Sequence, residues 1–211
     1  MELMERRAVR KAAWVTMTVL ALLIAVYGLA ALVVPGFGPP FMAERRTQVA
    51  WAVYAHLSGS LWALATGPWQ LSDRLRQRSL GWHRWLGRSY VLGVLVGGVG
   101  GLGLAPHAET GLVAGVGFGT LGVLWLAFTA LAFVRIRSGD LAAHRRWMVR
   151  SYALTLAAVT LRIYLPLGAL AGVGFEAAYP AIAWLCWVPN LVVAELWFVH
   201  RERSAPAVAR S

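Results

Sequence analysis

Six long apolar runs constrain the fold of this chain more than any other feature. In chain order they cover residues 12–34, 47–71, 89–105, 110–134, 151–172 and 177–199. Most reach the roughly 20 residues that a helix needs to cross a hydrocarbon core about 30 Å thick. The runs are continuously apolar and do not alternate with polar residues, which excludes a closed barrel. The sequence therefore predicts an all-α polytopic membrane protein with six transmembrane helices.

The composition agrees with a chain that is solvated by lipid. Charged residues make up 14% of its 211 residues, against about 25% in a typical soluble domain. Cys186 is the only cysteine, so neither an internal disulfide nor a cysteine-based metal cluster can form. The first apolar run is longer than that of a signal peptide and lacks a clear cleavage site, so we expect it to be retained. We expect residues 1–203 to form a single membrane domain and residues 204–211 to form a disordered tail.

The basic residues are distributed unevenly between the connections. Of the 20, four precede the first run, five lie between the second and third, five between the fourth and fifth, and three follow the sixth. This is the positive-inside asymmetry, and it predicts that both termini are cytoplasmic. We expect a bacterial inner-membrane protein. Its net charge of +11 would then face anionic lipid headgroups, with no nucleic-acid partner.

An internal repeat divides the predicted helices into two equivalent pairs. Residues 83–90 and 144–152 share a Trp, an Arg, a Ser and a Tyr, and their His residues match after one inserted residue. Upstream, residues 59–66 resemble residues 122–129 in their Gly, Leu, Trp and Thr positions. Spans two and three thus match spans four and five. This predicts a duplicated four-helix centre, flanked by spans one and six.

Glycine rows and prolines indicate where the helices pack and bend. Glycine recurs every fourth residue on one face of each of the third and fourth spans, at Gly93, Gly97 and Gly101 and at Gly111, Gly115 and Gly119. Because a short turn joins these spans, we expect the two spans to pack against each other. Pro166 and Pro189 should kink spans five and six, and polar side chains should bond the carbonyls that they free.

The repeat places two histidines at equivalent positions. His83 and His144 precede spans three and five, and two neutral imidazoles on facing helices can ligate a haem iron. His56, inside the second span, is a third candidate ligand. This interpretation predicts a b-type haem or electron-transfer membrane protein, by analogy with cytochrome b561-type cores. The alternative is that both motifs are interfacial anchors, in which the arginines bind phosphates and the tryptophans join the aromatic belt.

Polar residues inside the apolar runs are the other candidates for function. Arg162 lies near the middle of the fifth span, where an arginine costs about 2.5–3.5 kcal/mol on insertion scales. One interpretation is a buried anion or substrate site built from Arg162, His56 and Asn190, in a small-molecule carrier or receptor. The other is a structural or interaction protein in which Glu195, Asn190 or freed carbonyls neutralise Arg162 and tie helices together.

Several motifs recur together over most of the predicted membrane domain. They are His56 with Gly59, Gly67–Gln70, His83–Tyr90, His144–Thr155, Thr160–Arg162 with Tyr164, and Trp187–Asn190 with Glu195. From about Thr47 to Trp197, the chain resembles a family of predicted bacterial integral membrane proteins, domain-of-unknown-function family 2306. The resemblance implies an uncharacterised multi-pass membrane protein. It implies no particular substrate or cofactor.

Overall fold

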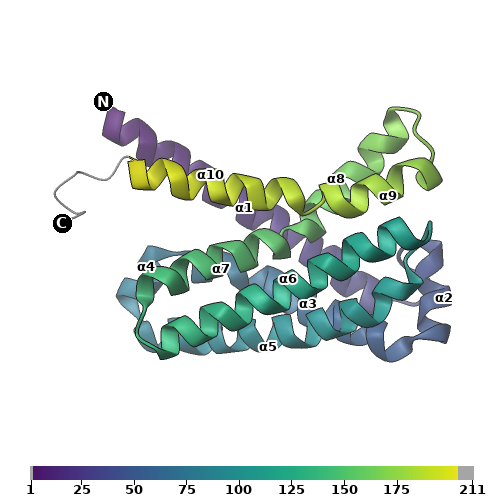
Figure 1. Cartoon of the computed structure of the whole chain (residues 1–211), viewed down its shortest axis with the longest axis horizontal. Coiled ribbons are helices and arrows are strands. Elements are labelled where there is room, and N and C mark those ends of the chain that lie inside the picture. The colour runs from purple at the N-terminus through teal and green to yellow at the C-terminus, as the bar shows by residue number, and fades with distance from the viewer. Residues whose placement is uncertain (1, 204–211) are drawn as a thin grey trace.

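The chain folds into helices joined by short turns, as the computed structural model of residues 2–203 shows (Figure 1). The elements are α1 (Glu2–Val33), α2 (Pro40–Gln48), α3 (Ala50–Gln70), α4 (Asp73–Arg78), α5 (Leu80–Leu104), the 3-10 turn η1 (Ala105–His107), α6 (Leu112–Arg137), α7 (Leu141–Thr155), α8 (Ala157–Leu170), α9 (Phe175–Leu185) and α10 (Val188–Arg203). No strand occurs among these residues, so the predicted all-α class is confirmed. The predicted tail, 204–211, lies outside the described residues.

Five segments of the described chain are long and apolar enough to cross a membrane. They are Ala8–Val33, Leu80–His107, Leu112–Arg137, Leu141–Leu170 and Phe175–Val199. The remaining predicted span, 47–71, corresponds to α3, which is not among them. Polar residues such as His56, Ser58 and Ser60 lower the mean hydropathy of α3. Its 21 residues still give a helix about 31 Å long at 1.5 Å per residue.

Two helices begin well before the predicted span boundaries. α5 starts at Leu80 and α7 at Leu141, whereas the apolar runs start at residues 89 and 151. Ser79 caps α5, because its hydroxyl accepts the Trp82 N–H at 3.3 Å. Asp140 caps α7, because its carboxylate accepts the Ala143 N–H at 2.9 Å. Both copies of the His–Arg–Trp motif are therefore helical, and the predicted boundaries were wrong because hydropathy does not register a capped polar turn.

The connections fall into two groups at opposite ends of the molecule (Figure 1). The start of α1, the short helix α4, the turn between α6 and α7 and the end of α10 lie at one end. α2, the turn between α5 and α6 and the turn between α8 and α9 lie at the other. The first group carries the arginine-rich segments. The structure thus places these basic connections at one end, which we call the basic end.

The glycine row of α5 packs against α3. A Cβ atom at Gly59 of α3 would lie 2.3 Å from the backbone nitrogen of Gly97, and one at Gly100 would lie 2.4 Å from that of His56. The two backbones are therefore in direct contact, as small residues allow in membrane helices. The expectation that α5 and α6 (Leu112–Arg137) pack against each other is confirmed, because a Cβ atom at Gly98 of α5 would lie 2.7 Å from the Leu126 side chain of α6. The short α5–α6 turn makes those helices neighbours but does not fix which faces meet.

The second helix pair, α6 and α7, repeats the arrangement of α3 and α5 with larger side chains. Trp125 of α6 donates its indole N–H to the Thr155 hydroxyl of α7 at 2.9 Å. The equivalent Trp62 of α3 lies against Gly93 of α5. Sequence-equivalent positions thus face each other in both pairs. The two helix pairs that the sequence repeat predicts therefore pack through equivalent positions.

Tyr90 and Tyr152, which are equivalent in the repeat, join the two pairs. Their rings lie 6.5 Å apart between centroids. Tyr152 covers Gly67 of α3, where a Cβ atom would come within 2.0 Å of the ring, and its hydroxyl donates to the Leu64 carbonyl at 3.3 Å. Tyr90 and Tyr152 are among the most deeply buried side chains of the protein. The centre of the bundle is therefore closed by aromatic packing.

The contact between α3 and α5 makes a stability prediction. Gly59→Ala should lower the free energy of unfolding by about 1–3 kcal/mol, the usual cost of overpacking, because its Cβ atom meets the Gly97 backbone. Gly81→Ala is the matched control, since no atom lies within 4 Å of its Cβ position. Thermal unfolding of the detergent-purified variants measures both. Equal melting temperatures would contradict the close approach of these helices.

Candidate functional site

A buried network of hydroxyl groups lies between the two helix pairs. Tyr90 bonds through its hydroxyl to Ser151 at 2.8 Å and to Thr155 at 2.9 Å. Ser151 also bonds Thr129 at 2.7 Å. All of these groups are neutral and partnered, as buried polar groups must be. The network therefore holds α5, α6 and α7 together.

The two motif histidines lie near each other at the basic end. His83 on the first turn of α5 and His144 on the first turn of α7 are close enough to interact electrostatically. His144 Nδ1 is 2.8 Å from the Ala132 carbonyl oxygen. Because only a protonated ring nitrogen can donate to a carbonyl, Nδ1 carries the proton and a neutral ring keeps its lone pair on Nε2. The structure thus places the two histidines that the repeat singled out at the same end of the molecule, each on the first turn of its helix.

His56 does not join this pair. Its Nδ1 atom donates to the Gly97 carbonyl at 2.9 Å, with the Ser60 hydroxyl at 3.3 Å. His83 lies beside the opposite end of α3, where Gln70 donates to the His83 carbonyl at 3.4 Å. The 14 residues from His56 to Gln70 cover about 21 Å of helix. His56 therefore belongs to a different part of the membrane domain.

Arg162 has no carboxylate partner among the described residues. It donates from Nη1 to the Ala158 carbonyl of its own helix at 2.9 Å. Its guanidinium lies over the Tyr27 ring of α1, 5.4 Å from the centroid, and it interacts electrostatically with His56 of α3. Residues from α1, α3 and α8 thus converge here, about 12 Å along α8 from its end at Leu170.

Glu195 and Asn190 have other partners. Glu195 forms a bidentate ion pair with Arg150, in which Nε and Nη2 donate to its two oxygens at 2.5 and 2.8 Å. Asn190 donates to the carbonyls of Ala153 at 3.2 Å and Cys186 at 3.0 Å and bonds the Thr160 hydroxyl. Neither residue bonds Arg162. Of the predicted polar residues, Asn190 and Glu195 are therefore not joined to Arg162.

Asn190 instead bridges two interrupted helices. The chain passes from α7 to α8 at Leu156, and from α9 to α10 at Cys186 and Trp187, just before Pro189. A proline blocks the carbonyl four residues earlier and disturbs the turn before it. The Asn190 amide bonds the Cys186 carbonyl within that turn. Asn190 thus bonds a carbonyl close to Pro189, although not the Leu185 carbonyl that the proline itself blocks, whereas α8 continues through Pro166 without interruption.

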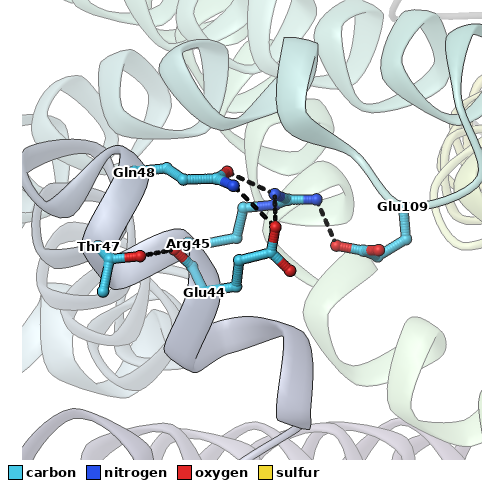
Figure 2. Close-up of polar contacts among 5 residues, drawn as sticks. All are labelled: Glu44, Arg45, Thr47, Gln48 and Glu109. Carbon is cyan, nitrogen blue, oxygen red and sulfur yellow. Dashed lines mark hydrogen bonds and ion pairs between the residues drawn. The ribbon is translucent and has the colours of Figure 1, made fainter.

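A second polar cluster, absent from the sequence predictions, lies at the end opposite to the basic end (Figure 2). Arg45 of α2 forms an ion pair with Glu109 in the α5–α6 turn at 2.6 Å, and it also donates to Gln48 at 2.6 Å. The Arg45 side chain is 15% exposed and that of Glu109 is 25% exposed. Glu44, on the outer side of Arg45, is 3.6 Å away. We call these four residues the cap cluster.

The cap cluster fixes α2 across the end of the bundle. On one side, Arg46 donates to the Ala31 carbonyl at the end of α1. On the other side, the Phe41 ring packs 6.4 Å from the Phe175 ring at the start of α9. The only signal for this helix in the sequence is Pro40 at its first position with Arg45 and Arg46 in its last turn. Nothing in the local sequence indicates Glu109 as the partner.

Comparison with known proteins identifies a family and nothing more specific. Residues 53–198 match the family described as "Predicted membrane protein (DUF2306)", and the chain belongs to this family. The expected resemblance is therefore confirmed. No curated protein and no solved structure gives a significant match. The protein is thus a membrane protein with several apolar helices from a family of unknown function.

The ion pair of the cap cluster predicts how α2 is held. Glu109→Gln should loosen α2, because it leaves the mostly buried Arg45 without its closest counter-charge. Hydrogen exchange of the amides in Pro40–Gln48 should become about tenfold faster or more, the effect of a loss of 1.4 kcal/mol. Glu44→Gln is the control, since Glu44 is 60% exposed and exposed pairs contribute little. Equal exchange in both variants would show that α2 is held by other contacts.

Proposed function

We propose that this protein binds a small organic anion inside the membrane at Arg162, as a carrier or receptor. The observation that supports the proposal is that no carboxylate among the described residues pairs with Arg162. Of the partners that the structural alternative offers, Glu195 pairs with Arg150 and Asn190 bonds the carbonyls of Ala153 and Cys186. Arg162 itself donates to a backbone carbonyl, that of Ala158, which carries no full negative charge. An intramembrane arginine is costly and generally faces a partner or a pathway. An anionic ligand would supply the missing counter-charge.

The surroundings of Arg162 suit an anion that carries an apolar body. A guanidinium can bind a carboxylate through two parallel hydrogen bonds. The Tyr27 ring positions it through a cation–π contact. Toward the basic end, Ala21, Leu64 and Val159 of α1, α3 and α8 form an apolar cluster. We infer a ligand whose carboxylate meets Arg162 and whose apolar part lies among the helices or in lipid.

We further propose that α3 is the sixth span and that both termini face the cytoplasm of a bacterial cell, in the inner membrane. α3 is long enough to cross the bilayer, and α5 lies against its small-residue face. With six crossings the arginine-rich connections share one side, and they do gather at the basic end. The positive-inside rule assigns that side to the cytoplasm.

The proposed orientation predicts the labelling of single cysteines in intact cells. After replacement of Cys186 by serine, a cysteine introduced by Arg137→Cys should react with a membrane-impermeant maleimide only once the cells are lysed. One introduced by Glu44→Cys, in α2 at the other end, should react in intact cells. Both positions are exposed in the fold. Labelling of the Arg137→Cys protein in intact cells would contradict the topology.

The anion site predicts a charge-specific stabilisation by ligand. Octanoate should raise the melting temperature of the detergent-purified protein more than octanol does, because only octanoate can pair with Arg162. Arg162→Ala should abolish the difference, and Arg162→Lys should retain part of it, since an ammonium keeps the charge but loses the bidentate geometry. Arg137→Ala, an exposed arginine at the end of α6, should behave as the parent.

Two results would contradict the anion site. Loss of the octanoate effect in Arg137→Ala would indicate a diffuse effect of positive charge. The second result has two parts: the parent shows no octanoate effect, and an Arg162→Leu, Glu195→Leu double variant melts at the same temperature as the parent. Together they would support a structural or interaction protein.

The haem hypothesis for His83 and His144 stays a prediction. Their proximity and the Nδ1–H of His144 suit axial ligation. The neighbouring arginines, Arg84 and Arg145, place the pair at headgroup level, where a porphyrin would be poorly covered. A Soret band in the purified protein would establish haem binding independently of Arg162.

A further inference from the structure

We propose that a cleft between α6 and α7 at the basic end binds the glycerophosphate headgroup of an anionic phospholipid. The cleft has a volume of about 290 Å³ and is lined by Arg135, Asp140, Ala143, Arg146, Trp147 and Arg150. It lies apart from Arg162, from the cap cluster and from the hydroxyl network. The inference uses the proposed orientation, in which the basic end faces the cytoplasm, but it does not depend on the anion site at Arg162.

The fold assembles this cleft from the end of one helix and the start of the next. Arg135 lies in the last turn of α6, and Gly139 turns the chain with a φ of +81°. Arg146 and Arg150 are four residues apart on α7, so they share one face of that helix. Three guanidinium groups therefore border a single hollow. Arginine is well suited to phosphate because its planar fork matches two phosphate oxygens.

Arg150 and Asp140, which line the cleft, are held in place by contacts with other residues of the protein. Arg150 lies over the Trp147 ring at 4.7 Å and over the Phe198 ring of α10 at 5.1 Å, in addition to its ion pair with Glu195. The Asp140 carboxylate caps α7 through the Ala143 N–H. The cleft is thus organised before any ligand arrives, which lowers the entropic cost of binding. Even with the Asp140 carboxylate, the charge of its lining residues is positive.

The position of the cleft favours a lipid over a free anion. Trp147 and the arginines are the residue types of the membrane–water border. On α6, Leu131 lies one turn before Arg135 and is 37% exposed, and Val134 directly precedes Arg135 and is 57% exposed. An acyl chain can lie along these residues while its phosphate occupies the cleft. Basic hollows between transmembrane helices at the cytoplasmic side commonly bind anionic headgroups.

Binding is tested with short-chain phosphatidylglycerol and phosphatidylcholine added to the detergent-purified full-length protein. Phosphatidylglycerol should raise the melting temperature, and phosphatidylcholine should not. In native mass spectrometry the parent should retain one phosphatidylglycerol molecule. The double variant Arg135→Gln, Arg146→Gln should bind phosphatidylglycerol at least about tenfold more weakly, because two basic contacts are lost. The single variant Arg135→Gln, at the exposed end of α6, should show a smaller loss in the same direction.

The control removes the same charge from the other connection at the basic end. Arg74→Gln, Arg78→Gln changes two exposed arginines of α4 and should bind as the parent does. An equal loss of affinity in this control would overturn the proposal in favour of diffuse surface attraction. Equal stabilisation by free glycerol 3-phosphate and by phosphatidylglycerol would overturn it in favour of a site for soluble phosphates. A double variant that binds as tightly as the parent would also overturn it.

Discussion

The backbone contact between α3 and α5 is the interaction on which the rest of the structure depends. In lipid, apolar side chains gain little by leaving one hydrocarbon surface for another, so helices associate through close packing and hydrogen bonds. Gly59 and Gly97 bring the two backbones together, and the contact holds α3, the least apolar of the predicted spans, inside the bundle. Tyr152 then packs on Gly67 of the same helix, which fixes the second helix pair against the first.

Several polar groups inside the described helices have partners of matching chemistry, whereas the charge of Arg162 has no carboxylate beside it. The hydroxyls around Tyr90 bond one another, Asn190 bonds the carbonyls at two helix interruptions, and Glu195 pairs with Arg150. Arg162 lacks a carboxylate among the described residues, although it lies well inside a span. This difference is why we assign a ligand to Arg162 and a structural role to Asn190. The cap cluster shows the opposite case, in which Arg45 finds its counter-charge in a turn 64 positions away.

Much of the fold could be predicted from hydropathy and repetition. The helical class and the family follow from apolar runs and motifs, and the pairing of spans two with three and four with five follows from the repeat. The boundaries at residues 89 and 151 were wrong because Ser79 and Asp140 cap turns that hydropathy scores as loops. α2 was missed because nine residues with two arginines give no apolar signal. For the candidate site, the repeat indicated that His83 and His144 are equivalent, and the fold places them on the first turns of α5 and α7 at the same end.

The sequence by itself determined that this is a membrane protein and in what order its helices follow. Each membrane helix forms its backbone hydrogen bonds internally and must match the thickness of the bilayer, so apolar runs of that length identify it. Only the tertiary structure decided which charges meet. An arginine at a given depth can pair with any acid on a neighbouring helix, and rotation of a helix by one residue changes that neighbour. Thus Glu195 pairs with Arg150 and leaves Arg162 to Tyr27 and His56, a choice that no spacing in the sequence encodes.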